Sequence, residues 1–288
     1  MIAPGPGARC WLDGAAVPVE ELRIPLADPA VLAGLGLFET LAVRSGRALD
    51  LEAHLARLEA GCGRLEIAPP PAALRPLLGE AVRAAECAAC GWLKIIVTAG
   101  GRWIVACGPM DPADEGRPAR AVVVPWRRNP ADPLSGLKSL CYAANTVGLG
   151  FARRRGADEG LWLNTRGHVA EGCASNVFAV VGGRLRTPAP GEGILPGVVR
   201  SHALAAAGRL RLAAHEGRLR RERLARASEA FLTSSLRGVR PLVALDGRPI
   251  GDGRPGPVTR RIAGEVARAR LGEAGRARLD SHPPAGEV

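Results

Sequence analysis

Lysine is a residue whose amine can form a Schiff base with an aldehyde, and this chain contains only two lysines, Lys94 and Lys138. Lys94 lies in the apolar run WLKIIVT, where alternation with Leu93 and Ile95 predicts a solvent-facing position on a strand. Lys138 lies between a loop and a predicted helix, with Ser139 as a candidate N-cap. Position alone favours Lys138 only slightly, and both lysines have an alternative as ordinary surface residues.

Two other features of the second half carry groups that a Schiff-base enzyme uses. Glu171 ends a predicted strand, and its carboxylate could keep the nitrogen of a bound ring protonated. The small residues that follow it would let a flat ring approach the backbone. An edge-strand glutamate is the alternative. Gly197 leads a predicted helix, and the amides of Val198 and Val199 in its first turn could bind a phosphate, although an ordinary loop entering a helix has the same appearance.

Short strands and amphipathic helices must position these residues. Apolar residues at three- and four-residue steps predict a helix over 51–65, and further helices are expected near 72–90, 140–155, 197–209 and 257–270. A hairpin is predicted for 176–181 and 185–187 across Gly182 and Gly183. The fold class is therefore α/β or mixed α+β, in two parts. We expect a smaller N-terminal domain over 1–112, a connection with a first strand over 113–135, and a larger cofactor-binding domain over 136–288.

Composition excludes several classes of protein. The net charge is +11, but the arginines that cause it are spread along the chain and aromatic residues make up 3%, which disfavours a nucleic-acid-binding protein as a distant alternative. No apolar run is long enough to span a membrane, and no signal peptide is recognised, so a cytoplasmic location is expected. Cys87 and Cys90 form a single CxxC without a second pair of ligands, so no metal site is expected and buried, reduced thiols are favoured.

These pieces occur together in an order that resembles the class IV (fold type IV) pyridoxal phosphate-dependent aminotransferases. This group includes the branched-chain and D-amino-acid aminotransferases and the aminodeoxychorismate lyases. The segment EGCASNVFAVVGGRLRTPAPGEGILPGVVR resembles the signature of the group, and GLFET, HLARL, GLKSL and FLTSSLRGVRPL support it. The resemblance covers about residues 10 to 265. It implies a two-domain enzyme with the cofactor in the cleft between the domains.

The resemblance also implies roles for individual residues. Lys138 would hold pyridoxal phosphate as a Schiff base and move the proton, and Glu171 would pair with the pyridine nitrogen. The other implied cofactor-binding residues are Arg57, Tyr142, Gly197, Val198, Val199 and Ser235. Phe38, Arg102 and the amide of Leu236 are candidates for substrate contact, although the TAGGRWIV stretch around Arg102 matches no single branch of the family.

The expected reaction is transfer of an amino group between an amino acid and a 2-keto acid, in a homodimer. The alternative is an aminodeoxychorismate lyase, which releases pyruvate and 4-aminobenzoate. The sequence favours the aminotransferase only moderately, because the chemistry of the site and not the fold determines the reaction. Neither the identity nor the handedness of the substrate can be read from it.

Overall fold

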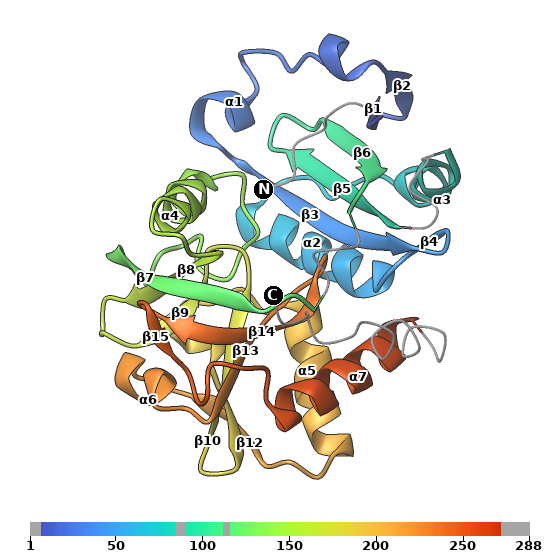
Figure 1. Ribbon diagram of the computed structural model, residues 1–288. Coiled ribbons are helices and arrows are strands. Elements are labelled where there is room, and N and C mark those ends of the chain that lie inside the picture. The colour runs from blue at the N-terminus through green and yellow to red at the C-terminus, as the bar shows by residue number, and fades with distance from the viewer. Residues whose placement is uncertain (1–6, 85–89, 112–115, 272–288) are drawn as a thin grey trace. The chain divides into compact units, whose positions relative to one another are not determined.

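The computed structural model describes residues 7–84, 90–111 and 116–271. These residues form two compact units, each with its own sheet (Figure 1). The first unit contains the described residues up to 111 together with Leu137–Ala143. The second contains the described residues between 116 and 136 and those from 144 to 271.

The first unit is built on a six-stranded antiparallel sheet in the order β2-β1-β6-β5-β3-β4. Its two longest strands, β3 and β5, pair along their whole length, from Gly36 opposite Thr98 to Arg44 opposite Cys90. The strands are β1 (Arg9–Leu12), β2 (Ala15–Val17), β3 (Gly36–Arg44), β4 (Arg47–Ala48), β5 (Cys90–Thr98) and β6 (Trp103–Pro109).

Helices α2 (Leu51–Leu65) and α3 (Leu74–Ala84) cover one face of this sheet, and the short α1 (Pro29–Ala33) precedes β3 (Figure 1). Alternate residues of β3, including Leu37 and Leu41, enter the core below α2 and α3, while Phe38 lies on the opposite face. The helix predicted over 51–65 is confirmed. The helix predicted over 72–90 is observed as far as Ala84, and residues 85–89 lie outside the described part of the chain.

The second unit contains a mixed nine-stranded sheet in the order β12-β11-β10-β13-β14-β7-β8-β9, with β15 paired to β14. Strands β7 and β8, β14 and β7, and β11 and β12 run parallel, and the other pairs are antiparallel. The strands are β7 (Ala119–Arg128), β8 (Glu159–Asn164), β9 (Val169–Gly172), β10 (Asn176–Val181), β11 (Arg184–Pro188), β12 (Ala214–Gly217), β13 (Glu229–Ser234), β14 (Gly238–Leu245) and β15 (Arg248–Pro249).

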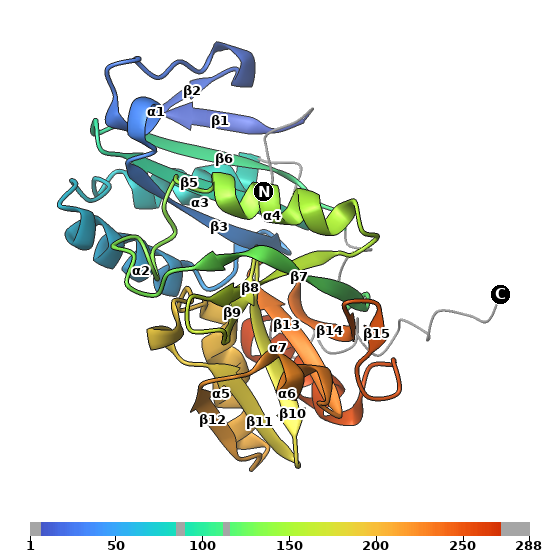
Figure 2. The same ribbon diagram turned by 90° about the vertical axis from the view of Figure 1, so that its left-hand side faces the viewer.

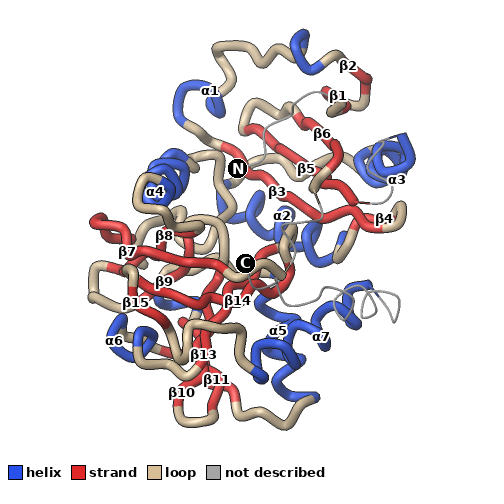
Figure 3. The backbone as a smooth tube through the Cα atoms, viewed as in Figure 1, coloured by secondary structure: helices blue, strands red, loops and turns tan. Residues whose placement is uncertain are grey.

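Helices α5 (Val198–Arg209) and α7 (Pro257–Leu271) pack on each other and on one face of this sheet (Figure 2). There Phe178 and Phe231 stack with their ring centroids 4.8 Å apart. Val177 and Leu232 point to the other face, whose core includes Leu224 of α6 (Arg221–Ala225). Helix α4 (Ala143–Arg153) packs through a separate cluster around β7 and β8. Both units contain helices and strands (Figure 3), which confirms the predicted mixed α/β class.

The predicted hairpin is confirmed: β10 and β11 are joined by Gly182 and Gly183, both with positive φ. Residues 137–143 belong to the first unit, whereas the sequence predicted them to lie in the larger domain. The backbone of this segment pairs with β3, through an isolated bridge between Leu37 and Ser139.

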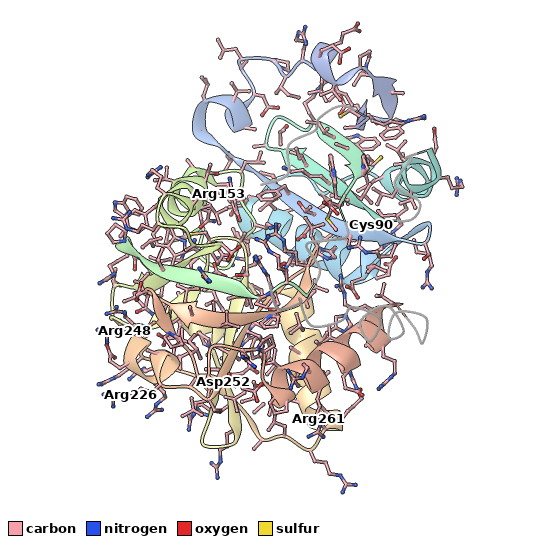
Figure 4. All side chains as sticks on the ribbon, viewed as in Figure 1. Cys90, Arg153, Arg226, Arg248, Asp252 and Arg261 are labelled. Atoms are coloured by element: carbon pink, nitrogen blue, oxygen red, sulfur yellow. The ribbon has the colours of Figure 1, made fainter. Side chains whose placement is uncertain are left out.

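Exposed arginines are dispersed over the second unit. Arg153, Arg226, Arg248 and Arg261, labelled in Figure 4, lie on or beside α4, α6, β15 and α7. Across the three described ranges, no helix combines the length and apolar character that a membrane span needs.

Candidate active site

Lys138 is held by backbone pairing with β3. The amide of Phe38 donates to the Lys138 carbonyl at 2.9 Å, and the amide of Leu140 donates to the Gly36 carbonyl at 2.9 Å. The ammonium group of Lys138 lies 4.4 Å from the centroid of the Phe38 ring. The backbone of Lys138 is therefore held by a sheet, which is more rigid than a loop.

Tyr142 and Phe38 form an aromatic pair beside this amine. Their rings meet edge to face with centroids 5.2 Å apart, and the Lys138 amine lies 5.7 Å from the Tyr142 ring centroid. The helix predicted near 140–155 is observed as α4, which begins at Ala143 and ends at Arg153. The Ser139 hydroxyl accepts instead from the Cys141 amide at 2.9 Å, in a local turn.

Lys94 is buried, so the prediction that it faces solvent is wrong. Its strand, β5, is an interior strand of the sheet, and its amine lies 5.0 Å from the centroid of the same Phe38 ring. Burial lowers the pKa of the Lys94 ammonium group. Both lysines of the chain thus lie near one aromatic side chain.

Glu171 lies on β9 with its carboxylate surrounded by donors. Arg128 pairs with one oxygen, while the other accepts from the Asn176 side chain at 3.2 Å and from the Leu195 amide at 2.8 Å. Donors from Arg128, Asn176 and Leu195 thus hold the Glu171 carboxylate in place.

Arg128 is a site residue that sequence reasoning missed. It ends β7, donates to Asn145 at 2.6 Å and lies with its guanidinium 5.3 Å from the centroid of the Trp162 ring. The Trp162 indole also donates to Asn145, at 3.0 Å. In the sequence, Arg128 is recognisable only as the arginine that ends a strand before the proline-rich loop. Its spacing from Glu171 does not indicate that the two residues are in contact.

The start of α5 is built around Gly197, which occupies the N-cap position without a side-chain cap. A Cβ atom on Gly197 would lie 2.0 Å from the Asn176 side-chain oxygen, so this position has room only for glycine. Asn176 donates to the Leu195 carbonyl at 2.9 Å as well as to Glu171. Val198 and Val199 are buried in the first turn, where amides lack an acceptor within the helix.

Ser235 and Leu236 lie in the turn between β13 and β14, and both are half-buried. The Ser235 carbonyl accepts from Arg270 of α7 at 2.9 Å, which ties the turn to the helix. The turn follows Thr233, whose buried hydroxyl has no hydrogen-bond partner among the described residues.

The two predicted arginines of the first unit have different environments. Arg57 on α2 pairs with buried Glu39 through two nitrogens, each 2.7 Å from a carboxylate oxygen. Arg102 pairs with Asp13 at 2.8 Å and has a side chain that is 40% exposed. Cys87 lies outside the described residues, and Cys90 is half-buried.

Lys138, Arg57, Tyr142, Phe38 and Arg102 therefore belong to the first unit. The predicted residues of the second unit are Glu171, Gly197, Val198, Val199, Ser235 and Leu236. Within the second unit, direct hydrogen bonds connect Glu171 to the loop that enters α5.

Comparison with known proteins identifies one family. Residues 36–245 match the sequence profile of amino-transferase class IV. The chain is similar to a candidate branched-chain-amino-acid aminotransferase of Methanocaldococcus jannaschii, with 28% identity over 88% of this chain and 93% of the relative. It is 34% identical to the branched-chain-amino-acid aminotransferase of Escherichia coli K12, over 49% of this chain. The matched segment spans about half of the E. coli relative, at 47% of its length.

Solved structures are similar over most of the chain. The branched-chain aminotransferase of Thermoproteus uzoniensis with norvaline has a TM-score of 0.84 and 28% identity, covering 94% of this chain and 97% of that one. A candidate 4-amino-4-deoxychorismate lyase of Legionella pneumophila has a TM-score of 0.77 and 26% identity, covering 84% and 93%.

Proposed function

The chain belongs to the class IV aminotransferase family, and we propose from this that it binds pyridoxal phosphate and transfers an amino group between an amino acid and a 2-keto acid. The observation that carries the proposal is the link that Asn176 makes between Glu171 and the start of α5. It places a carboxylate suited to a ring nitrogen and a helix start suited to a phosphate within a few hydrogen bonds of each other.

The residues present fit this cofactor. Lys138 supplies an amine beside an aromatic ring, Glu171 supplies a carboxylate surrounded by donors, and Gly197 leaves the entrance of α5 free of a side chain. We assign the phosphate to Arg57, to Ser235 and to the amides of Val198 and Val199. When bound, the cofactor supplies an aldehyde that joins an amine and a ring that withdraws electrons.

In this proposal the Lys138 amine would hold the cofactor. It would also accept the proton from the substrate α-carbon and return a proton during the transfer. Glu171 would keep the ring nitrogen protonated, and Arg128 and Asn176 hold Glu171 in place. Tyr142 would reach the phenolic oxygen of the cofactor, while Phe38, Arg102 and the Leu236 amide would contact substrate.

The central test compares the two lysines. Purified protein with pyridoxal phosphate should show the visible absorbance band of lysine-bound cofactor, and Lys138→Ala should lose this band. Lys94→Ala is the matched control because it removes the other lysine of the chain. Loss of the band in Lys94→Ala, with Lys138→Ala unchanged, would overturn the assignment. Amino acids that bleach the band without an added keto acid then identify the donor and its handedness.

The lyase is retained as a second candidate because of the structural similarity to the L. pneumophila protein. Incubation with aminodeoxychorismate in the absence of a keto acid separates the two reactions. Release of pyruvate at an enzymatic rate supports the lyase, whereas absence of pyruvate release, together with transfer of an amino group from an amino acid to an added keto acid, supports the aminotransferase. We also expect a homodimer, which light scattering measures.

A further inference from the structure

A short turn joins two residues of the candidate site in the second unit. Glu171 lies near the end of β9, Asn176 begins β10, and the turn over 172–175 connects them. The Gly172 amide closes the turn by donating to the Ser175 carbonyl at 2.7 Å. The Asn176 side chain then donates back to Glu171 at 3.2 Å. The conformation of the turn therefore determines how the Asn176 amide meets the Glu171 carboxylate.

Glu159, the first residue of β8, binds this turn through its side chain. The Ser175 hydroxyl donates to one Glu159 oxygen at 2.8 Å, and the Gly160 amide donates to the other at 3.0 Å. The backbone of Ala174 makes a further hydrogen bond to the same carboxyl group. One side chain of β8 thus holds two consecutive residues of the turn that follows β9, the strand beside it.

The Glu159 carboxyl group is enclosed by the protein, with 6% of the residue exposed. Burial raises its pKa, and the hydrogen bonds from Ser175 and from the backbones of Gly160 and Ala174 act in the opposite direction. A buried polar group that loses its partners costs free energy, and this holds for the carboxyl group and for the turn. Each of them therefore keeps the other in place.

Close packing leaves the turn little room to shift. A Cβ atom on Gly172 would lie 2.3 Å from the Ser175 hydroxyl and 3.0 Å from the Glu159 carboxyl group. The Cys173 amide donates to the Gly160 carbonyl at 2.8 Å, and a Cβ atom on Gly160 would lie 3.0 Å from the Cys173 sulfur. Glycines at 160 and 172 thus let β8 and the turn approach each other closely.

We propose that Glu159 is a positioning residue that holds Glu171 and Asn176 in register through the turn, and so sets the pairing of Glu171 with a ring nitrogen. The inference rests on the proposed function, in which Glu171 pairs with the nitrogen of pyridoxal phosphate. Glu159 acts through the turn and does not touch the cofactor itself. Its contribution is to recognition of the ring nitrogen and not of the phosphate.

Titration of the cofactor-free full chain with two compounds tests this. One is pyridoxal phosphate, and the other is its carbocyclic analogue, in which a C–H group replaces the ring nitrogen while the aldehyde and the phosphate are retained. The absorbance band of lysine-bound compound reports both Kd values. Wild-type protein should prefer pyridoxal phosphate by at least about tenfold, the value of one hydrogen bond to a charged group.

Two variants should reduce this preference. Glu159→Leu removes the hydrogen bonds to Ser175 and to the backbone of the turn, and it should remove most of the roughly tenfold preference. Ser175→Ala removes one hydroxyl donor without altering a buried charge, and it should reduce the preference by about threefold to fivefold. In both variants the Kd for the carbocyclic analogue should change by less than about twofold. Ser175→Ala also keeps the proposal testable if Glu159→Leu does not fold.

Glu159→Gln separates hydrogen bonding from charge. Its side-chain oxygen can accept from the Gly160 amide, and its NH2 group can donate to the Ser175 hydroxyl. This variant should therefore keep the wild-type ratio of Kd values. A ratio as low as that of Glu159→Leu would show that the charge at position 159 acts on the ring, and the positioning role would be overturned.

Glu229→Leu is the matched control. Glu229 is another buried carboxyl group of the second unit, at 8% exposure, and it accepts from the amides of Val258 and Thr259 at 3.0 and 2.7 Å at the start of α7. Its replacement should lower stability and leave the ratio of Kd values unchanged. A loss of preference equal to that of Glu159→Leu would indicate general damage and contradict the proposal.

Failure of the proposed function has a different signature. In that case wild-type protein forms no lysine-bound band with either compound. Equal Kd values for the two compounds in wild type would refute recognition of the ring nitrogen and the positioning role with it. If wild type prefers pyridoxal phosphate and both Glu159→Leu and Ser175→Ala keep its ratio, only the positioning role is refuted.

Discussion

Replacement of Gly197 by alanine tests the packing at the start of α5. The added Cβ would lie 2.0 Å from the Asn176 side-chain oxygen, so the Asn176 amide must move. That movement breaks its bonds to the Leu195 carbonyl and the Glu171 carboxylate. A neutral hydrogen bond contributes about 1 kcal/mol and one to a charged group about 2 kcal/mol. Alanine also restricts the unfolded chain more than glycine does, which offsets roughly 0.5–1 kcal/mol of this loss. Gly197→Ala should therefore lower the free energy of unfolding by about 2 kcal/mol.

Urea denaturation followed by circular dichroism measures this difference. Gly208→Ala is the matched control in the same helix, because a Cβ there meets no atom within 4 Å, and it should stabilise the protein by roughly 0.5–1 kcal/mol. In an Asn176→Ala background, Gly197→Ala should have little effect. If Gly197→Ala is as stable as wild type, or costs the same in both backgrounds, the steric argument is refuted.

Three further predictions concern charge and thiols. Glu39→Gln should remove about 3 kcal/mol of stability at neutral pH, because folding lowers the carboxyl pKa from 4.5 to about 2. The contribution of the ionised carboxylate to stability is present above pH 4.5 and disappears as the pH falls through 2. Urea titrations measure this, and an equal loss of stability in acid for the variant and the wild type would refute the prediction. Arg128→Met should lower the free energy of unfolding by roughly 2–4 kcal/mol, because it leaves buried Glu171 without its cation. Adding Glu171→Gln to this variant should recover part of the lost stability in the same assay. With a thiol reagent at pH 8, exposed Cys141 should react quickly, while burial raises the Cys173 pKa to about 12 and should protect it; unchanged fast labelling in Cys141→Ser would contradict this.

Local patterns were sufficient for much of the fold. The helix over 51–65 and the hairpin at Gly182 and Gly183 depend on periodicity and turn residues within one segment. The start of α4 depends on a distant strand, because pairing with β3 keeps residues 138–140 out of the helix. No local signal could have revealed that competition.

The residues of the candidate site likewise include some with a local sequence signal and some without one. Lys138 and Glu171 could be proposed as site residues from the sequence because each lies in a motif with recognisable neighbours. Arg128 is 43 residues from Glu171 along the chain, and only the pairing of strands in the second sheet brings them together. Lys94 was misjudged because alternation along a strand does not show whether the second face of the sheet is covered.

The division of the chain has a consequence for dissecting the protein into fragments. The segment Leu137–Ala143 belongs with the first unit although residues 116–136 before it belong with the second. The polypeptide thus passes between the units more than once, and a fragment that ends near residue 113 would lack Lys138 and the backbone hydrogen bonds that its segment makes with β3. A split version of the protein would retain the lysine on the first unit only if the break were placed after residue 143. The same interleaving means that the first unit cannot be exchanged between relatives as one uninterrupted stretch of gene.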